Sequence, residues 1–414
     1  MLKDKSIPVL RFKNFIDAWE QRKLSDFGKA TGGTSIESEF SEDGIYKVIS
    51  IGSYSEDSVY RDQGIRAIES DKTKNRVLNK DDLAMILNDK TASGNIIGRA
   101  LLIEESGVYV YNQRTERIEI DHDNYDSLFL YEMLNAPSIR DKIIKQSQGN
   151  TQIYVNWPTI SMTEYHVPKI EEQRKLGAYF QNLDNLITLH QRKCEQLIKT
   201  KNSCLGKMFP KEGSLYPEIR FEGFNEAWEQ RKFDEWGDFY YGHSCPKWSV
   251  TEDATTPCIR YGELYTKFGA KIDKVYSYTN MPPEKLRFSN GTEVLIPRVG
   301  EDPMDYNHCT WLSLKGVAIG EMISVFNTNQ DPLFSATMFN ATLQKEFAIR
   351  VEGGSVTNLY FDKLRNIDIS YPSLQEQKKI AAFFENIDIL ITLHQRKLDK
   401  LNKLKKSLLN NMFV

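Results

Sequence analysis

Arginine, lysine, asparagine and glutamine residues gather near expected turns in two segments of the chain, Leu24–His166 and Phe233–Ser370. Arginine suits the acceptor edge of guanine, asparagine and glutamine suit the edge of adenine, and lysine mostly holds phosphate. These residues predict contacts with double-stranded DNA, although each one alone could be an ordinary exposed polar residue. The candidates are Lys90, Thr91, Arg99, Asn112, Gln113, Arg114 and Arg117 in the first segment, and Arg260, Tyr261, Lys267, Arg287, Arg298, Asn327 and Asn329 in the second.

Motifs for catalysis are missing from the sequence. It contains no G-x-x-x-x-G-K-[ST] motif of a motor ATPase and no G-x-G-x-x-G motif for a dinucleotide. Nor does it contain the Asn/Asp-Pro-Pro-aromatic motif with which amino-methyltransferases hold a flipped adenine. Acidic pairs at Asp81/Asp82 and Glu301/Asp302 could form a nuclease site, but such pairs near turns usually belong to surface turns. We therefore predict no catalytic residue.

Cysteine and histidine spacing argues against a metal site. The five cysteines are odd in number and form no C-x-x-C pair, which disfavours both a disulfide framework and a zinc knuckle. His243/Cys245 and His308/Cys309 could be half-sites for a metal, but ordinary packing or surface use is the commoner explanation for such pairs. We predict that the chain binds no metal.

The elements that must position the DNA candidates occur twice. PVLRFKNFIDAWEQRKLSDFG begins at Pro8 and PEIRFEGFNEAWEQRKFDEWG at Pro217; their Phe and Trp residues suggest an apolar lead-in that docks on the following domain. The heptapeptide ITLHQRK occurs at Ile187 and again at Ile391, an offset of 204 residues (391 − 187). These repeats indicate an internal duplication.

Each ITLHQRK lies within a heptad pattern that follows a proline, Pro168 or Pro372, and predicts one helix of about 37 residues. The two helices should pair antiparallel, so that a rod with a pseudo-two-fold axis separates two domains. We expect His190 and His394 near that axis, where they would fix the register. The predicted pairing seam comprises Leu176, Phe180, Leu183, Ile187, His190 and Leu197 in the first helix, and Ile380, Phe384, Ile387, Ile391, His394 and Leu401 in the second.

The expected fold class is therefore two α/β (α+β) domains separated by two long antiparallel coiled-coil helices. The expected boundaries are 1–168 for the first lead-in and domain, 169–210 for the first helix, 211–372 for the second lead-in and domain, and 373–414 for the second helix.

Charge and hydropathy are compatible with this organisation. The net charge is −3, but residues 171–211 and 375–414 each carry eight Lys/Arg against four Asp/Glu, so the rest of the chain is acidic. DNA binding depends on local basic residues rather than on the total charge, and part of the attraction could come from a partner. No long apolar run and no apolar signal core appear in the sequence, so we expect a cytoplasmic protein without membrane contact.

With these repeats the chain resembles the specificity subunit of type I restriction-modification systems. The resemblance covers the lead-in (RF-x-x-F…AWEQRK), a variable segment and the P-x-x-E-Q-(R/K)-K helix with ITLHQRK, each present twice. It implies two target-recognition domains that read an asymmetric split DNA sequence, with half-sites about one helical turn apart. It also implies two modification (adenine methyltransferase) subunits and restriction subunits as partners, with S-adenosylmethionine, ATP and Mg²⁺ bound by those partners.

Two alternatives remain. The chain could be a free-standing DNA-binding or coiled-coil interaction protein, which would not co-purify with an adenine methyltransferase. It could also be a nuclease with an unrecognised acidic site, which would cleave DNA in the presence of Mg²⁺ alone.

Overall fold

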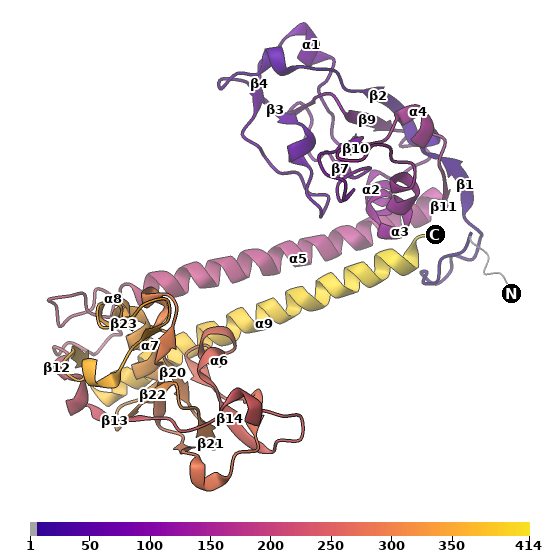
Figure 1. The fold of residues 1–414 in the computed structure, drawn as a ribbon. Helices are drawn as coiled ribbons and strands as arrows, with labels where there is room; N and C mark the ends of the chain where they lie inside the picture. Colours follow the sequence, from indigo (N-terminus) through magenta and orange to yellow (C-terminus); the bar gives the residue numbers. More distant parts are fainter. Residues whose placement is uncertain (1–5) are drawn as a thin grey trace. The chain divides into compact units, whose positions relative to one another are not determined.

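The computed structural model describes residues 6–414, so the first five residues of the expected lead-in lie outside the described range. The chain divides into two compact units: unit 1 is Met1–Gln191 with Gln395–Val414, and unit 2 is Arg192–His394. Each unit thus contains one mixed α/β domain and parts of both long helices (Figure 1). The unit borders fall inside the helices because the helix ends share the apolar cores of the domains.

The domain of unit 1 is built on two small sheets. One has the strand order β2-β9-β5-β7, the other the order β4-β3-β8, and two further pairs, β1-β11 and β10-β6, lie beside them. The strands are β1 (Glu20–Lys23), β2 (Gly28–Gly32), β3 (Tyr46–Ile49), β4 (Arg66–Ala67), β5 (Leu83–Ile86), β6 (Asn88–Asp89), β7 (Ala100–Leu102), β8 (Tyr109–Tyr111), β9 (Thr115–Ile120), β10 (Ile153–Tyr154) and β11 (Glu164–Val167).

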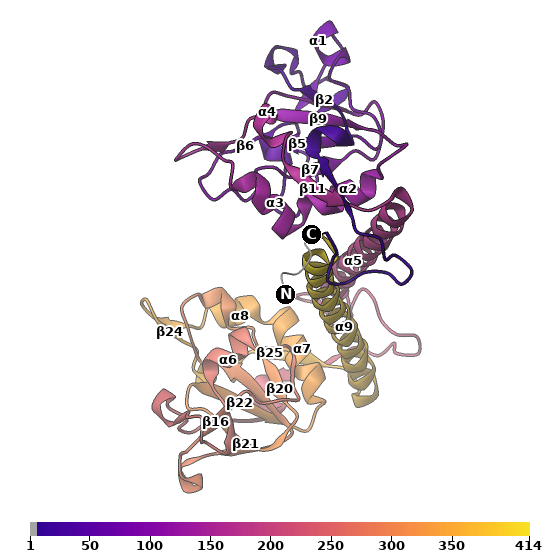
Figure 2. The same cartoon turned by 90° about the vertical axis from the view of Figure 1, so that its right-hand side faces the viewer.

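Helices α1 (Asp71–Lys74), α2 (Ser127–Asn135), α3 (Pro137–Ile144) and α4 (Trp157–Ile160) complete this domain. Asp126 caps the start of α2, and Pro137 begins α3 as a separate helix directly after it. In Figure 2, α2 lies between the sheet and the start of α5 (Ile170–Leu205), and α3 lies farther from that helix. Their apolar faces and the central strand β5, whose residues are all buried, form the core.

The domain of unit 2 has a similar arrangement with additional strands. Its sheets have the orders β13-β22-β18-β20-β15 and β16-β14-β21-β17, with the smaller groups β12-β25 and β19-β24-β23. The strands are β12 (Glu229–Lys232), β13 (Gly237–Tyr241), β14 (Thr256–Ile259), β15 (Lys271–Ile272), β16 (Ser277–Thr279), β17 (Phe288–Asn290), β18 (Glu293–Pro297), β19 (Val299–Gly300), β20 (Thr310–Leu312), β21 (Lys315–Ile319), β22 (Ile323–Thr328), β23 (Glu352–Gly353), β24 (Thr357–Asn358) and β25 (Asp368–Tyr371). Helices α6 (Tyr261–Thr266), α7 (Pro332–Thr342) and α8 (Gln344–Ala348) precede the long helix α9 (Leu374–Met412).

Matched contacts show how two divergent segments reach the same arrangement. Asp126 and Asp331 each cap the helix that follows, accepting a hydrogen bond from the backbone of Phe129 or Phe334. Asn135 of α2 exchanges hydrogen bonds with the backbone of Ala100, as Asn340 of α7 does with Cys309. A few polar contacts at repeated positions therefore fix the framework, while most of the other residues differ.

The expected long helices are present, with 36 residues in α5 and 39 in α9. Within unit 1, Phe180 stacks on Phe413 and Asp184 pairs with Lys405. Since the residue numbers rise along one helix as they fall along the other, α5 and α9 run antiparallel there.

Unit 2 has the same antiparallel pairing. Lys201 lies 2.5 Å from Asp388, and Phe209 stacks on Phe384. Residues Met208 and Phe209, which follow α5, pack in unit 2 as Met412 and Phe413 pack at the end of α9 in unit 1.

Each lead-in is fixed to the first turn of a long helix. Arg11 donates hydrogen bonds to both carboxylate oxygens of Glu172, and Arg220 does the same to Glu376. Both carboxylates are almost fully buried. Trp19 and Trp228 enter the domain cores as expected, so the lead-ins dock on the domains and also on the helices.

Candidate nucleic-acid interface

A tight turn follows strand β2 in unit 1. The backbone N–H of Gly33 donates to the carbonyl oxygen of Thr115 at 2.8 Å. A Cβ atom on Gly33 would lie only 2.0 Å from the carbonyl oxygen of Asn112, so the backbones approach too closely for any other residue. The turn after β2 is thereby pressed against the turn between β8 and β9. Thr34 of the first turn and Gln113 and Arg114 of the second are exposed.

Unit 2 has the same pair of turns. The N–H of Gly242 donates to Ile323 O at 3.0 Å, and a Cβ atom on Gly242 would lie 2.0 Å from Gly320 O. The exposed residues differ, however: His243 replaces Thr34, and Glu321 replaces Gln113. We call each pair of turns a glycine-turn unit, comprising residues 33–35 with 112–114 in unit 1 and residues 242–244 with 320–322 in unit 2.

An arginine lies beside each glycine-turn unit. The carbonyl oxygen of Arg76 accepts a hydrogen bond from Tyr111 N of β8, and that of Arg287 accepts one from Ile319 N of β21, so the two arginines occupy matching places beside these strands. Arg287 was predicted from the sequence, whereas Arg76 was missed. The basic run Lys72, Lys74, Arg76 and Lys80 was the signal that could have found it.

The predicted residues of unit 1 fall into two groups. Arg114 lies exposed at the turn with a positive φ of 71°, and Lys90 and Thr91 are exposed after β6. Asn112 is buried, because its side chain bonds to the backbone of Ile36 and to Glu37, and Arg117 pairs with Asp82 at 2.8 Å. Arg99 is partly buried and donates to Asn95 O and Ser58 Oγ. The contacts of Asn112 and Arg117 with other residues of the domain help to hold the turn in place. That the residues of either group contact DNA stays a prediction.

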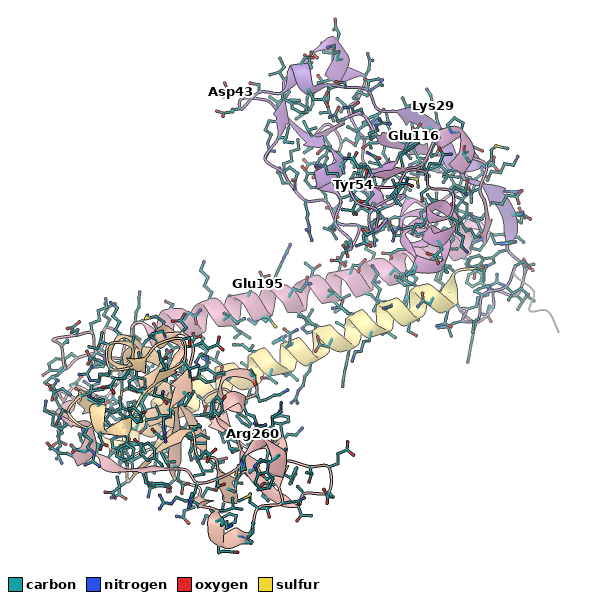
Figure 3. All side chains as sticks on the ribbon, viewed as in Figure 1. Lys29, Asp43, Tyr54, Glu116, Glu195 and Arg260 are labelled. Carbon is teal, nitrogen blue, oxygen red and sulfur yellow. The ribbon has the colours of Figure 1, made fainter. Side chains whose placement is uncertain are left out.

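Four predicted residues of unit 2 surround its glycine-turn unit. Arg287 donates to Tyr241 O at 3.0 Å, and Arg298 stacks on Tyr241 and Tyr360 with 4.7 and 5.4 Å to the ring centroids. Arg260, which Figure 3 labels, is adjacent to Gly320 and is followed by the exposed Tyr261. These residues form a basic and aromatic surface at one end of the sheet.

The other three predicted residues of unit 2 lie elsewhere. Lys267 follows the last turn of α6, where it lies over the ring of Tyr276. Asn327 and Asn329 are at the end of β22 opposite to Gly242, since β22 runs from Ile323 to Thr328. Asn329 lines a recess together with Glu229, Asp234 and Glu235, which is an acidic setting. The fourteen DNA candidates are therefore not gathered at one end of each domain.

The surroundings of two acidic residues near the turns shift their pKa values in opposite directions. Hydrogen bonds, first from Ser35 and then from Asn112, lower the pKa of Glu37 to about 2. Glu37 thus stays ionised and also accepts from Gln113 at 3.1 Å. By contrast, burial raises the pKa of Glu116, labelled inside unit 1 in Figure 3, to about 7.

Four of the residues considered for a metal or nuclease site have structural roles. Cys245 packs with Cys258 and Ala318 in an apolar cluster, and Cys309 is fully buried. Asp302 caps a short helix through Met304 N, and Asp82 pairs with Arg117. Within residues 6–414 no group of three or more His, Cys, Asp or Glu side chains could hold a metal ion.

The predicted seam residues are buried to different degrees. The seam residues near the start of each helix are buried: Leu176, Phe180, Leu183, Ile187, Ile380, Phe384 and Ile387. The seam residues nearer the middle of each helix are partly buried: His190, Leu197, Ile391, His394 and Leu401. Leu176, Phe180, Ile380 and Phe384 also belong to the domain cores, so the seam serves helix and domain together. The register role of His190 and His394 stays a prediction.

Leucines of the repeated helix sequence are exposed. Leu186 and Leu189 in α5 are 45% and 60% exposed, and their repeats Leu390 and Leu393 in α9 are 42% and 44% exposed. Glu195, labelled on α5 in Figure 3, is also exposed. Among the described residues, no helix combines the length and the apolar character needed to cross a membrane.

Comparisons with known proteins agree on one family. The chain matches the family model of the type I restriction modification DNA specificity domain over residues 16–199 and 317–403, more than half of its length. Two specificity subunits of Methanocaldococcus jannaschii are similar in sequence. The putative MjaX subunit is 24% identical over 69% of this chain and 66% of its own length. The MjaVIII subunit is 21% identical over 81% of this chain and 79% of its own length.

A solved structure has the same fold along nearly the whole chain. The specificity (S) subunit of a type I system from M. genitalium aligns over 99% of both chains with a TM-score of 0.62 and 14% identity. The repeated domains, the two long helices and the family match lead to one assignment: the chain belongs to the type I restriction-modification DNA specificity family.

Proposed function

We propose that the chain is the DNA sequence-recognition subunit of a type I restriction-modification complex, and that each domain reads one half of an asymmetric split target. The observation that supports this most strongly is the pair of glycine-turn units. Their backbones are held alike at Gly33 and Gly242, but Thr34 and Gln113 are replaced by His243 and Glu321. Exposed side chains that differ on matched turns suit two different base sequences.

We infer that α5 and α9 form one antiparallel coiled coil, related by a pseudo-two-fold axis, that sets the distance between the half-sites. The antiparallel contacts inside each unit support this arrangement. Adding one heptad to each helix, about 10 Å, should require a longer spacer between the half-sites. An unchanged spacer would contradict the proposal.

The modification subunits are the proposed partners of the exposed leucines. Leu186, Leu189, Leu390 and Leu393 expose apolar surface on helices that are otherwise rich in charge, as is typical of a protein-binding face. Leu189→Glu combined with Leu393→Glu should abolish co-purification with the modification subunits. Ile349→Glu, which changes a residue 74% exposed outside the long helices, is the matched control and should leave the complex intact.

Catalysis is proposed to reside in the partner subunits, which would bind S-adenosylmethionine, ATP and Mg²⁺ in the cytoplasm. The missing catalytic motifs and the internal pairing of Asp82 support this division of labour. Purified chain incubated with DNA and Mg²⁺ should leave the DNA intact. Cleavage that persists without partners would instead favour a nuclease.

Mapping methylated adenines in cells with and without the chain tests the proposed function. The expected result is a split motif that is methylated only when the chain is present, with two different halves. If the same adenines are methylated in cells with and without the chain, the chain does not direct modification.

A further inference from the structure

Arg76 and Arg287 occupy matching places in two domains of different sequence. Val77 pairs with Val110 of β8, and Phe288 pairs with Ala318 of β21, so each arginine directly precedes a residue that bridges to the matching strand. The two arginines also receive matching backbone hydrogen bonds at their carbonyl oxygens. The fold therefore presents one arginine at the same point of both domains.

The guanidinium group of each arginine is oriented by an aromatic ring beside the glycine-turn unit. Arg76 lies over Tyr111 at 5.7 Å from the ring centroid, and its Nε donates to Thr34 Oγ1 at 3.3 Å. Arg287 lies over Tyr240 at 4.7 Å, and its Nη1 donates to Tyr241 O at 3.0 Å. Stacking restrains the planar guanidinium and leaves further N–H donors available.

These two arginines differ from the structural arginines of the chain. Arg11, Arg117 and Arg220 each pair with a carboxylate that is nearly buried. Among the described residues, neither Arg76 nor Arg287 forms an ion pair with a carboxylate. A positive charge that is oriented but not neutralised suits an external anion.

A residue that is the same in both domains is poorly suited to distinguish two half-sites. The neighbouring residues are the ones that differ: Gln113 and Arg114, both exposed, are replaced by the exposed Glu321 and the partly buried Met322. Contacts with phosphate position a protein on the duplex without reading its sequence, whereas base contacts specify the sequence. The shared arginine therefore fits the first role and its differing neighbours fit the second.

We propose that Arg76 and Arg287 are equivalent phosphate-binding residues, one for each half-site, which fix the glycine-turn unit on the DNA backbone. This inference rests on the proposed function, because it assigns a role within DNA recognition.

The test uses the full chain with its modification subunits and two duplex probes, one carrying the methylated motif and one of random sequence. Arg76→Ala and Arg287→Ala should each weaken binding to both probes by a similar factor and reduce the slope of log K against log salt by about 0.9. The double variant should reduce the slope by about 1.8. The base preference at every position of the motif should not change.

Arg22→Ala and Arg231→Ala are the matched controls. These exposed arginines also occupy repeated positions, but they pair with Glu20 and Glu229 and lie on β1 and β12, before the strands that lead to the turns. They should leave the salt slope unchanged. Arg76→Lys keeps the charge and should retain most of the binding lost in Arg76→Ala.

The possible outcomes separate the inference from the proposed function. If the unaltered complex does not prefer the motif to the random duplex, the proposed function itself fails. If it does, and Arg76→Ala changes one base preference while the salt slope stays the same, Arg76 reads a base and the inference is wrong. Unchanged binding in both alanine variants, with melting temperatures like that of the unaltered protein, also overturns it.

Discussion

The ammonium group of Lys405 lies 2.7 Å from both carboxylate oxygens of Asp184, which ties the last turns of α9 to α5 within unit 1. The same lysine lies 3.1 Å from Glu132 of α2. Burial raises the pKa of Glu132 to about 8, although the charge of Lys405 opposes this shift. In unit 2, Lys201 pairs with Asp388, and Thr337 stands on α7 where Glu132 stands on α2.

Lys405→Met should therefore destabilise its helix end more than Lys201→Met does. At pH 8 the first change removes the cation that favours ionised Glu132, so this buried carboxyl group must bind a proton or stay charged beside Asp184, at a cost of about 2 kcal/mol. The second change removes only a partly exposed pair and should cost about 0–1 kcal/mol. Amide hydrogen exchange in the last two turns of α9 and of α5 measures both effects, and equal protection losses would contradict the expectation.

Glu116→Gln should alter how stability depends on pH. Burial raises the pKa of Glu116 from 4.5 to about 7, so between these values the folded state binds more protons than the unfolded state. The free energy of unfolding of the unaltered protein should therefore fall as pH rises through about 7. The contribution of Glu116 to this fall is on the order of 2–3 kcal/mol. The Glu116 carboxylate lies beside Gly32, where an added Cβ atom would be 3.3 Å from it.

Urea unfolding of both proteins at pH 5 and pH 8 measures this effect, because other groups cancel in the difference between them. The glutamine variant should be the more stable protein at pH 8, and its advantage should shrink at pH 5. A difference in stability that does not depend on pH would show that Glu116 does not titrate in this range.

Gly33→Ala and Gly242→Ala should each disable one domain. The added methyl group would meet a backbone oxygen at 2.0 Å, which only a shift of one turn could relieve. Gly262→Ala is the matched control, because a Cβ atom there meets nothing within 4 Å. DNA binding by the complex should fall strongly for the first two variants and remain for the third. Unaltered binding by Gly33→Ala would show that this turn is not part of the DNA interface.

The repeated parts of the fold were predictable from the sequence, because their residues recur. Pro168 and Pro372 with the heptads that follow predict both long helices, and the lead-in tryptophans Trp19 and Trp228 are buried as expected. The division into compact units was not predictable. The helix ends pack into the domain cores through contacts such as Phe413 with Phe129, which join residues far apart in the chain.

The candidate interface was only partly predictable, since residue type does not reveal which polar groups are used internally. Asn112 and Arg117 have suitable side chains for DNA, but Glu37 and Asp82 engage them. The match of Gly33 with Gly242 has the same offset of 209 residues (242 − 33) as the lead-ins, and could have been found by extending that repeat. Arg76 could not be matched to Arg287 in this way, because their equivalence depends on strand pairing.

Each domain is proposed to read its own half-site. The most direct test maps methylated adenines in cells that carry the chain with both Gln113→Ala and Arg114→Ala. These substitutions change two exposed residues of the first glycine-turn unit. We predict that one half of the motif becomes less specific while the other half and the spacer stay the same. A change in both halves, or an unchanged motif, would contradict the claim.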